Sequence, residues 1–440
     1  MMSLQLFTRQ QRKVPVHRWL TKAGKTVFAL LTAGTVLFLS ACSQNYKKPV
    51  IIWTDKSEFA SYAELFNASQ DQCKVIVIYK ESPAEAFPIP KDVQAPDIVI
   101  GPWLKNERVR KYFSPLDHLF NDLQLNKSIF YSQLLEIGNI DDKQYLLPVS
   151  FNLPAIIFSK KNQELIDESY ILSLDQIKNI SASYNEKNKS GVFTAMGFAP
   201  RWNPNFLYTA AKLKGANFKE TGDSFSWNEQ NLQRAISYLT EWTTSHNEST
   251  STESDFAFKY LYTPAYKLIS SNRCLFAYTS SNLLFNLPAE KIQDIEYRWL
   301  HENYSIPIED KIISLGLYKK SKNTDAAELF ILWLMKESSQ KAILERQSKM
   351  NLSTATFGIA DGFSSIKSVN ERVFPVYYPI LFRNLPVAEY VTSPNILPSR
   401  WESIKEKVIM PYLLAAVDTG AQEPEMTLQK RFSEWNKQYF

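Results

Sequence analysis

Two short apolar segments enclose a helical pattern near the start of the polar part of the chain. Residues 49–53 and 75–79 are rich in Val and Ile, which is typical of buried strands. Between them, four apolar side chains at 59, 62, 63 and 66 recur at helical spacing. A strand, a helix and a strand in this order form a βαβ unit, in which the strands are parallel and the helix covers the sheet. The sequence therefore predicts an α/β fold.

Candidate binding residues follow the strands of this predicted sheet. Ligands of open α/β sheets bind beyond the carboxyl ends of the strands. Trp53 and Asp55 end the first strand, and Trp103 follows a further buried strand at 97–100. We therefore expect these residues near a binding site, with packing in the core as the alternative role of each tryptophan.

The N-terminus has the composition of an export signal. Six Lys and Arg residues and no acidic residue precede an apolar run at 27–39, which is too short to span a bilayer. The run ends in Leu-Ser-Ala-Cys, which resembles a bacterial lipoprotein processing site. We expect residues 1–41 to be a signal peptide and Cys42 to carry lipid such as palmitate, leaving an exported domain tethered to a bacterial membrane, periplasmic or on the outer face. An uncleaved signal anchor is the alternative.

Removal of this leader changes the charge of the chain. The full sequence has 50 Lys and Arg residues and 45 Asp and Glu residues, a formal net charge of +5. Without the six basic residues of the leader, the net charge becomes −1. A chain without a basic excess lacks the electrostatic part of nucleic-acid binding. The composition therefore argues against a nucleic-acid partner.

Metal and cofactor chemistry find little support. His118, His246 and His301 are widely spaced, and no Cys-x-x-Cys pair accompanies them. Twelve glycines in 440 residues limit the number of phosphate-cradling loops. Cys73 and Cys274 are expected to be buried thiols, with a disulfide as the alternative in an oxidising compartment. We expect neither a metal nor a cofactor.

The length after the leader suits two lobes, each large enough to bury a core. Two segments, 143–158 and 311–318, are typical of strands that cross between such lobes. After the second segment, Thr324 is expected to cap a helix. The apolar stripe of this helix would contain Ala326, Leu329, Phe330, Trp333 and Leu334.

Six stretches of the sequence, taken in order, resemble a known family. From about Val50 to the C-terminus, the chain is similar to extracellular solute-binding proteins of ABC transporters, in the carbohydrate-binding branch (family 1) that includes maltose-binding protein. The resemblance rests on the order of the stretches more than on any one of them. They are IIWTDKSEF, APDIVIGPW, KQYLLPVSFNLPAIIFSKK, NRCLFAYTSSN, ISLGLYKKSKNTDAAELFILWLM and LPSRWESIKEKV.

The resemblance implies a type II periplasmic-binding-protein fold. Two α/β lobes, each a mostly parallel sheet flanked by helices, would enclose a cleft that closes by hinge motion. It also implies a monomeric receptor that captures a mono- or oligosaccharide, delivers it to an ABC transporter permease and catalyses no reaction. The chain would cross between lobes near 150, 307 and 350, so that the first lobe contains 42–150 plus 307–350 and the second 151–306 plus 351–440.

The resemblance also implies ligand contacts in the first lobe. Asp55 and Lys56 occupy the loop where relatives bind sugar hydroxyls, and Trp103 and Asn106 follow the strand at 97–100. Asn152 falls at the crossover position where maltose-binding protein presents an acid. Because an amide retains the hydrogen bonding but not the charge, this difference argues against maltose itself.

In the second lobe, five further residues are candidates: two follow the strand-like stretch GVFTAMGF, two sit at a strand end of the family, and one resembles a family tryptophan near the closing helix. Aromatic side chains suit the C–H faces of sugars, while polar side chains suit the hydroxyls. For the arginine and both tryptophans, packing within the protein is the alternative role. These candidates are Arg201, Trp202, Tyr278, Ser280 and Trp401.

Three other functions remain open. A secreted glycoside hydrolase would need two facing carboxylates about 5 to 10 Å apart, and nothing in the sequence pairs Glu58, Asp117 or the adjacent Asp141 and Asp142. A sugar phosphate, polyamine or peptide would be a different solute for the same kind of receptor. A lipoprotein that only bridges other proteins would show an exposed apolar patch and no deep cleft.

Overall fold

The parallel unit predicted near residue 50 lies at one edge of a six-stranded sheet. The computed structural model describes residues 48–121, 124–222, 224–350, 356–418, 420 and 426–439. In it, β1 (Val50–Thr54) pairs in parallel with β2 (Val75–Tyr79) and β3 (Ile98–Gly101). The helix between β1 and β2, α2 (Phe59–Ser69), buries the four predicted side chains, Phe59, Tyr62, Ala63 and Phe66.

The other half of this sheet is antiparallel. β16 (Ile313–Leu317) lies between β3 and β6 (Leu146–Phe151) and runs antiparallel to both, and β17 (Phe363–Ser364) pairs antiparallel with β6. The prediction of mostly parallel sheets is therefore wrong in this detail. β6 and β16 belong to segments that pass between the lobes, and the return path of the chain sets their relative direction.

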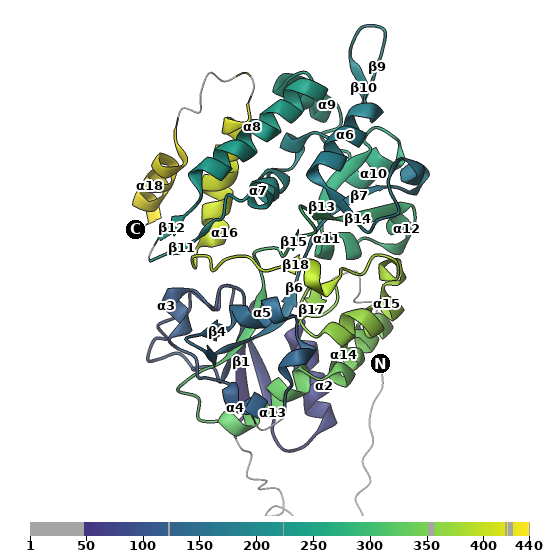
Figure 1. Cartoon of the computed structure of the whole chain (residues 1–440). Helices are drawn as coiled ribbons and strands as arrows, with labels where there is room; N and C mark the ends of the chain where they lie inside the picture. The colour runs from purple at the N-terminus through teal and green to yellow at the C-terminus, as the bar shows by residue number, and fades with distance from the viewer. Residues whose placement is uncertain are drawn as a thin grey trace, which may run out of the picture. The chain divides into compact units, whose positions relative to one another are not determined.

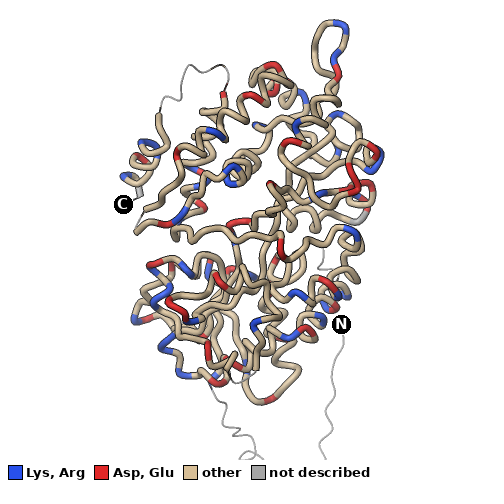
Figure 2. The backbone as a smooth tube through the Cα atoms, viewed as in Figure 1, with Lys and Arg blue, Asp and Glu red and all other residues tan. Residues whose placement is uncertain are grey.

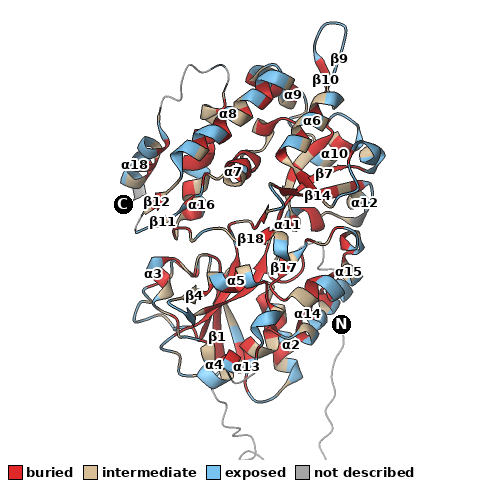
Figure 3. Cartoon of the chain, in the orientation of Figure 1, coloured by how far each residue is buried: buried red, intermediate tan, exposed pale blue. Residues whose placement is uncertain are grey.

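Helices of the first lobe surround this sheet, as Figure 1 shows. Figure 3 shows that the central strands are buried while the outer faces of the helices are exposed, and the edge strand β2 is partly exposed. These helices are α3 (Glu107–Arg110), α4 (Asp117–Asn121), α5 (Ser132–Ile137), α13 (Thr324–Leu334), α14 (Glu337–Lys349) and α15 (Phe374–Tyr377).

The second lobe is built on a four-stranded mixed sheet of order β13-β7-β14-β8. The strands are β7 (Pro154–Ser159), β8 (Ile171–Ser173), β13 (Phe276–Ser280) and β14 (Ile295–His301), and only β14 and β8 are parallel. The helices of this lobe are α6 (Leu174–Tyr184), α7 (Pro204–Leu213), α8 (Glu229–His246), α9 (Thr250–Lys259), α10 (Ala265–Ser270), α11 (Ser281–Phe285), α12 (Ala289–Ile292), α16 (Trp401–Ile404), α17 (Met410–Ala416) and α18 (Leu428–Tyr439).

Short antiparallel pairs complete the two lobes. They are β4 (Asn139–Ile140) with β5 (Lys143–Gln144), β9 (Glu186–Lys187) with β10 (Phe193–Ala195), and β11 (Lys219–Thr221) with β12 (Ser224–Ser226).

The chain crosses between the lobes more than once, and the last crossing lies later than expected. β6 leads directly into β7, which is the crossing predicted near 150. β15 (Ile306–Pro307) and β18 (Val391–Thr392) pair in parallel on two further crossing segments. The boundary expected at 350 is wrong, because β17 completes the first sheet and α15 packs beside it. Local sequence does not reveal that this later segment returns to the first lobe.

Aromatic side chains join the cores of the two lobes. Phe285 from α11 stacks on Phe357 at 4.7 Å between ring centroids, and Trp299 from β14 lies 5.7 Å from Phe363 of β17. All four side chains are buried. The core of the first lobe therefore continues into one face of the second sheet.

The two cysteines of the described residues have the burial that the sequence predicts. Cys73 and Cys274 are both buried thiols, and burial raises the pKa of Cys274 to about 12.

The helix predicted after Thr324 is α13, but Asn323 occupies its N-cap position and Leu329 is 38% exposed. On that side of α13, the predicted apolar stripe is shifted by one residue from the residues that are buried.

The predicted leader and Cys42 lie outside the described residues. None of the helices in the described ranges has the length and apolarity that a bilayer span requires.

Candidate functional site

The loop after β1 places two acidic groups and a lysine at the edge of the first sheet. The Lys56 amide donates a hydrogen bond to Thr54 Oγ1 at 3.1 Å, which fixes the turn. Asp55 Oδ1 and Glu58 Oε1 are buried, and neither has a hydrogen-bond partner among the described residues. Burial raises the pKa of both carboxyls, and Lys56 opposes the rise in each case. Two acceptor oxygens are therefore held in this loop with hydrogen-bonding capacity unused.

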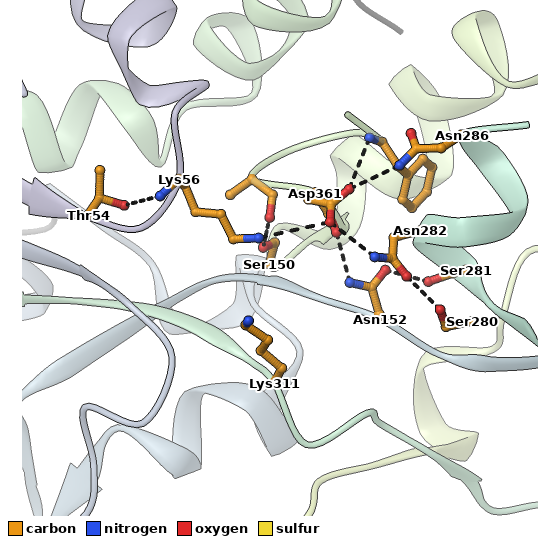
Figure 4. Close-up of polar contacts among 12 residues, drawn as sticks. Thr54, Lys56, Ser150, Asn152, Ser280, Ser281, Asn282, Asn286, Lys311 and Asp361 are labelled. Carbon is orange, nitrogen blue, oxygen red and sulfur yellow. Dashed lines mark hydrogen bonds and ion pairs between the residues drawn. The ribbon is translucent and has the colours of Figure 1, made fainter. Parts of the chain in front are cut away.

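A polar cluster at the junction of the lobes adjoins this loop (Figure 4). The Asn152 side chain, on the first crossing, donates through Nδ2 to the Asp361 carbonyl at 2.8 Å and accepts through Oδ1 from Ser281 at 2.6 Å. Ser280 donates to Asn282 Oδ1 at 2.6 Å. Three predicted residues, Lys56, Asn152 and Ser280, therefore lie in one cluster with residues from both lobes.

Asp361 lies at the centre of this cluster. Its Oδ2 accepts a hydrogen bond from Asn282 Nδ2 at 3.0 Å and lies 3.9 Å from Lys56 Nζ. Its Oδ1 accepts from Asn286 Nδ2 at 3.3 Å and from the Phe357 amide at 3.4 Å. The carboxylate thus contacts the first lobe through lysine and the second lobe through two side-chain amides, one on α11 and one at its C-cap.

A cavity of about 370 Å³ lies between the two lobes beside Asp55. Its first-lobe wall contains Pro102 and Trp103, and its second-lobe wall contains Arg400, Glu402 and Trp435. The volume is within the range of small-molecule sites. The remaining lining residues are Glu81, Ser82, Pro83, Ala84, Glu85, Lys311, Ser399 and Ser403.

Trp103 is the aromatic side chain that links this cavity to both lobes. Its backbone has a φ of 64°, which is uncommon for a bulky residue. The indole packs against the core of the second lobe as well as a cluster in the first. It also lines a smaller cavity with Asp310 and Leu397. A residue that contacts both lobes in this way is sensitive to their separation.

The cavity contains charges of both signs, with acids in excess. Asp55, Glu81, Glu85 and Glu402 supply carboxylates. The basic side chains are Lys311, whose Nζ lies 3.3 Å from Glu402 Oε1, and Arg400. Figure 2 shows charges of both signs distributed over the outside of both lobes. The acid excess and the unused acceptor Asp55 Oδ1 favour a solute rich in hydrogen-bond donors.

Two predicted residues of the second lobe line a different pocket. Trp202 stacks on Phe256 at 5.5 Å and 17° between ring planes, and it donates through Nε1 to the Glu253 carbonyl at 3.1 Å. Tyr278 lines the same pocket, while its hydroxyl contacts Thr209 and Glu309. This pocket, of about 260 Å³, has mostly apolar and aromatic walls.

Four other predicted residues have contacts within the protein. Trp53 and Trp401 are fully buried, and Trp401 donates through Nε1 to Asp310 at 2.8 Å. Asn106 caps α3, accepting from the Val109 amide and donating to the Trp103 carbonyl. Arg201 forms an ion pair with Asp418 at 3.6 Å. The structure therefore does not bring these four side chains to the junction cluster.

The carboxylates considered for a hydrolase are dispersed. Asp141 and Asp142 form the exposed turn between β4 and β5, with φ of 51° and 60°. Asp117 accepts hydrogen bonds from the Gln144 amide at 3.2 Å, outside the cavity. Within the described residues, no group of three His, Cys, Asp or Glu side chains is arranged to hold a metal ion.

Sequence reasoning missed Asp361, Asn282 on α11 and Asn286 at the C-cap of that helix. The chain reaches the junction at Asp361 through a tight loop, in which Gly358 has a φ of 57° and Asp361 one of 59°. Three consecutive small or turn-forming residues in Gly-Ile-Ala-Asp-Gly were the available signal for such a loop. Nothing local in the sequence indicates which other segments the loop meets.

The fold and the site together define a two-lobe binding protein of the periplasmic-binding-protein type. A family model of bacterial extracellular solute-binding proteins matches residues 61–364, and the chain belongs to this family. Its members bind a solute and are not enzymes. No curated protein matches the sequence.

Solved structures share this fold across most of the chain. The sugar-binding protein MalE from Xanthomonas citri is 12% identical with a TM-score of 0.66, over 89% of this chain and 96% of that chain. An ABC substrate-binding protein from Listeria monocytogenes, in complex with cycloalternan, is 14% identical with a TM-score of 0.60, over 89% and 98%. A cyclic alpha-maltosyl-1,6-maltose binding protein from Arthrobacter globiformis is 14% identical with a TM-score of 0.59, over 88% and 98%.

Proposed function

We propose that this protein is a monomeric, lipid-anchored receptor that captures an oligosaccharide at the lobe junction and delivers it to an ABC transporter permease. The solute-binding family supports capture of a small molecule outside the cytoplasm. The carbohydrate class, the anchor at Cys42 and the permease are parts of the proposal. In this receptor, Asp55, Lys56, Trp103 and Asn152 contact the solute.

The observation that carries the carbohydrate assignment is the buried Asp55 Oδ1, an acceptor that has no hydrogen-bond partner among the described residues and belongs to a residue of the cavity wall. A buried acceptor without a donor costs about 1 to 3 kcal/mol, and a sugar hydroxyl supplies the missing donor. The Trp103 indole beside Asp55 offers an apolar face for the C–H groups of a pyranose ring. Acceptors next to an aromatic face match the two kinds of surface that a sugar presents.

The structural neighbours support the same class of solute. They include proteins solved with cycloalternan, with mannotriose and with maltotetraose. These ligands contain several sugar rings, and for this reason we favour an oligosaccharide over a monosaccharide.

Closure would follow from contacts that the solute makes with both lobes. A solute held by Asp55 in the first lobe and by residues of the opposite wall contacts both only when the lobes are closed. Binding then favours the closed state by the difference in contact free energy.

The first experiment is a thermal-shift panel on the full-length protein in mild detergent. The panel contains cycloalternan, mannotriose, maltotetraose, glucose, a sugar phosphate, spermidine and a peptide. A ligand at 100 times its Kd adds about 2.7 kcal/mol of stability, and we expect this for an oligosaccharide that is recovered chemically intact. Cleaved sugar would instead indicate a glycoside hydrolase. Stabilisation by a non-sugar alone would change the solute class, and no response at all would favour a lipoprotein that bridges proteins.

Substitution of the two strongest candidates tests the location of the site. Trp103→Ala and Asn152→Ala should each weaken oligosaccharide binding by about 1 to 3 kcal/mol, through loss of an aromatic face or of a hydrogen bond. Isothermal titration calorimetry measures the effect. Thr244→Ala, on the exposed face of α8, is the matched control. Unchanged affinity in both variants would remove these residues from the site.

A further inference from the structure

We infer that Asp361 is a positioning residue, which holds Lys56 and Asn152 in the orientation that receives the solute. This inference rests on the proposed function, since it assigns a role at the same site. The role of Asp361 follows from its contacts.

Asp361 uses both its side chain and its backbone at the junction. The carbonyl accepts one hydrogen of the Asn152 amide nitrogen, so one hydrogen of that nitrogen remains available. The carboxylate lies 3.9 Å from Lys56 Nζ, an ammonium that carries three donors. Lys56 therefore keeps donors for a solute while its direction is restricted by Asp361.

The carboxylate is itself held from the second lobe. Asn282 on α11 and Asn286 at the C-cap of this helix donate to the two oxygens of the Asp361 carboxylate. Because these residues are four apart, they lie on the same side of the helix. The position of Asp361, and through it that of Lys56, therefore depends on contact between the lobes.

The backbone around Asp361 leaves the residue little freedom. Ala360 and Asp361 both have left-handed φ angles, of 47° and 59°. The Ala360 amide donates to the hydroxyl of buried Tyr62 at 3.1 Å, and its carbonyl accepts from Ser150 at 3.1 Å. Two elements of the first lobe thus fix the loop. A loop fixed in this way is suited to orienting other groups.

This arrangement gives a specific expectation for the interaction between two residues. If Asp361 acts by directing Lys56, removing its charge and removing the lysine must have overlapping effects on binding. If Asp361 and Lys56 contribute only to folding, then substituting either residue would change Kd little once differences in stability are taken into account. A double-mutant cycle separates the two cases.

The test compares Asp361→Asn, Lys56→Met and the double variant in the full-length protein. Asn tolerates the left-handed φ and keeps an acceptor for Asn282, so it removes chiefly the charge. Titrations use cycloalternan, mannotriose and maltotetraose, with the melting temperature measured for each variant. We expect each single variant to raise Kd about tenfold, and the double variant to raise it no further than Lys56→Met alone.

The controls distinguish this inference from the proposed function. Asp142→Asn removes an acid at an exposed turn with nearly the same φ, 60°, and should leave Kd unchanged. Asn282→Ala is a second test of the inference. It removes one hydrogen bond that holds the Asp361 carboxylate, and it should raise Kd about threefold. Unchanged Kd in Asp361→Asn and Asn282→Ala, or additive effects in the double variant, would overturn the inference while leaving the receptor intact. Failure of the wild-type protein to bind any panel sugar would overturn the proposed function, and the inference with it.

Discussion

Buried acids in the loop after β1 show a conflict between stability and binding at the scale of single residues. Asp55 and Glu58 each lose solvation on burial, and this loss raises the pKa of both. The positive charges of Lys56 and Lys311 oppose this rise in the pKa of Asp55. Groups retained at such a cost are characteristic of functional sites.

Asp55→Asn should therefore weaken binding and stabilise the protein at neutral pH. The folded-state pKa of Asp55 is raised, so the folded protein binds this proton more tightly than the unfolded chain does. The contribution of Asp55 to stability is thus favourable at low pH and is lost as pH rises through the raised pKa. Near pH 7 the Asn variant should melt at a higher temperature than the wild-type protein, and near pH 3 the difference should disappear.

Binding should show the opposite dependence on pH. A solute hydroxyl donates a stronger hydrogen bond to the ionised carboxylate of Asp55 than to its neutral acid, so oligosaccharide affinity should fall as pH decreases through the raised pKa. Calorimetric titrations at several pH values measure this, and the dependence should be weaker in Asp55→Asn. A variant with lower melting temperature and wild-type affinity at pH 7 would contradict both expectations.

Candidate residues of the site could be named from the sequence on two grounds. Asp55 and Trp103 follow predicted strands, whereas Lys56 and Asn152 match positions of the family that the chain resembles. Asp361 could not be predicted, since its place depends on a loop that meets residues far away in the sequence. For Trp401, the sequence could not separate a ligand role from packing, because a tryptophan serves either purpose equally well.

At the scale of elements, α13 shows where periodicity alone loses accuracy. Ala327, Phe330, Ile331 and Leu334 are its buried residues, and Leu329 is 38% exposed. Phe330 packs edge to face against Phe66 of α2, with ring centroids 5.3 Å apart. On a strongly apolar helix, more than one set of residues at helical spacing is apolar, and packing against α2 decides which set is buried.

Two substitutions on α13 should differ sharply in their effect. Phe330→Ala removes a fully buried ring and should lower the free energy of unfolding by about 3 to 5 kcal/mol. Leu329→Ala should change it by less than about 0.5 kcal/mol. Urea denaturation followed by circular dichroism measures both. Similar losses in the two variants would mean that α13 is rotated from the position described.

At the scale of the whole molecule, sequence order predicted the two lobes but not their full membership. The βαβ unit near residue 50 and the first crossing were correctly predicted, because both depend on neighbouring segments. The place of β16 within the sheet and the return of β17 to the first lobe were not predicted, because each pairs with a strand that is distant in the sequence. Strand direction in both sheets follows from these long-range returns.

The proposed anchor is also a property of the whole molecule. Cys42→Ser should abolish labelling of the expressed protein by radioactive palmitate and shift it from the membrane fraction to the soluble fraction, because lipidation supplies the attachment. Phase partitioning in detergent measures the shift. Oligosaccharide affinity should be unchanged in this variant. Persistent membrane association without label would instead support an uncleaved signal anchor.

The position of β16 also has a consequence for the timing of folding. β16 lies in the middle of the first sheet, between β3 and β6, yet the chain reaches it only after most of the second lobe. Until residues 313–317 are available, β3 and β6 have no partner between them. Long-range pairing of this kind slows folding. A nascent chain that must pass a membrane before folding therefore benefits from this order, since its first half cannot complete a stable sheet prematurely.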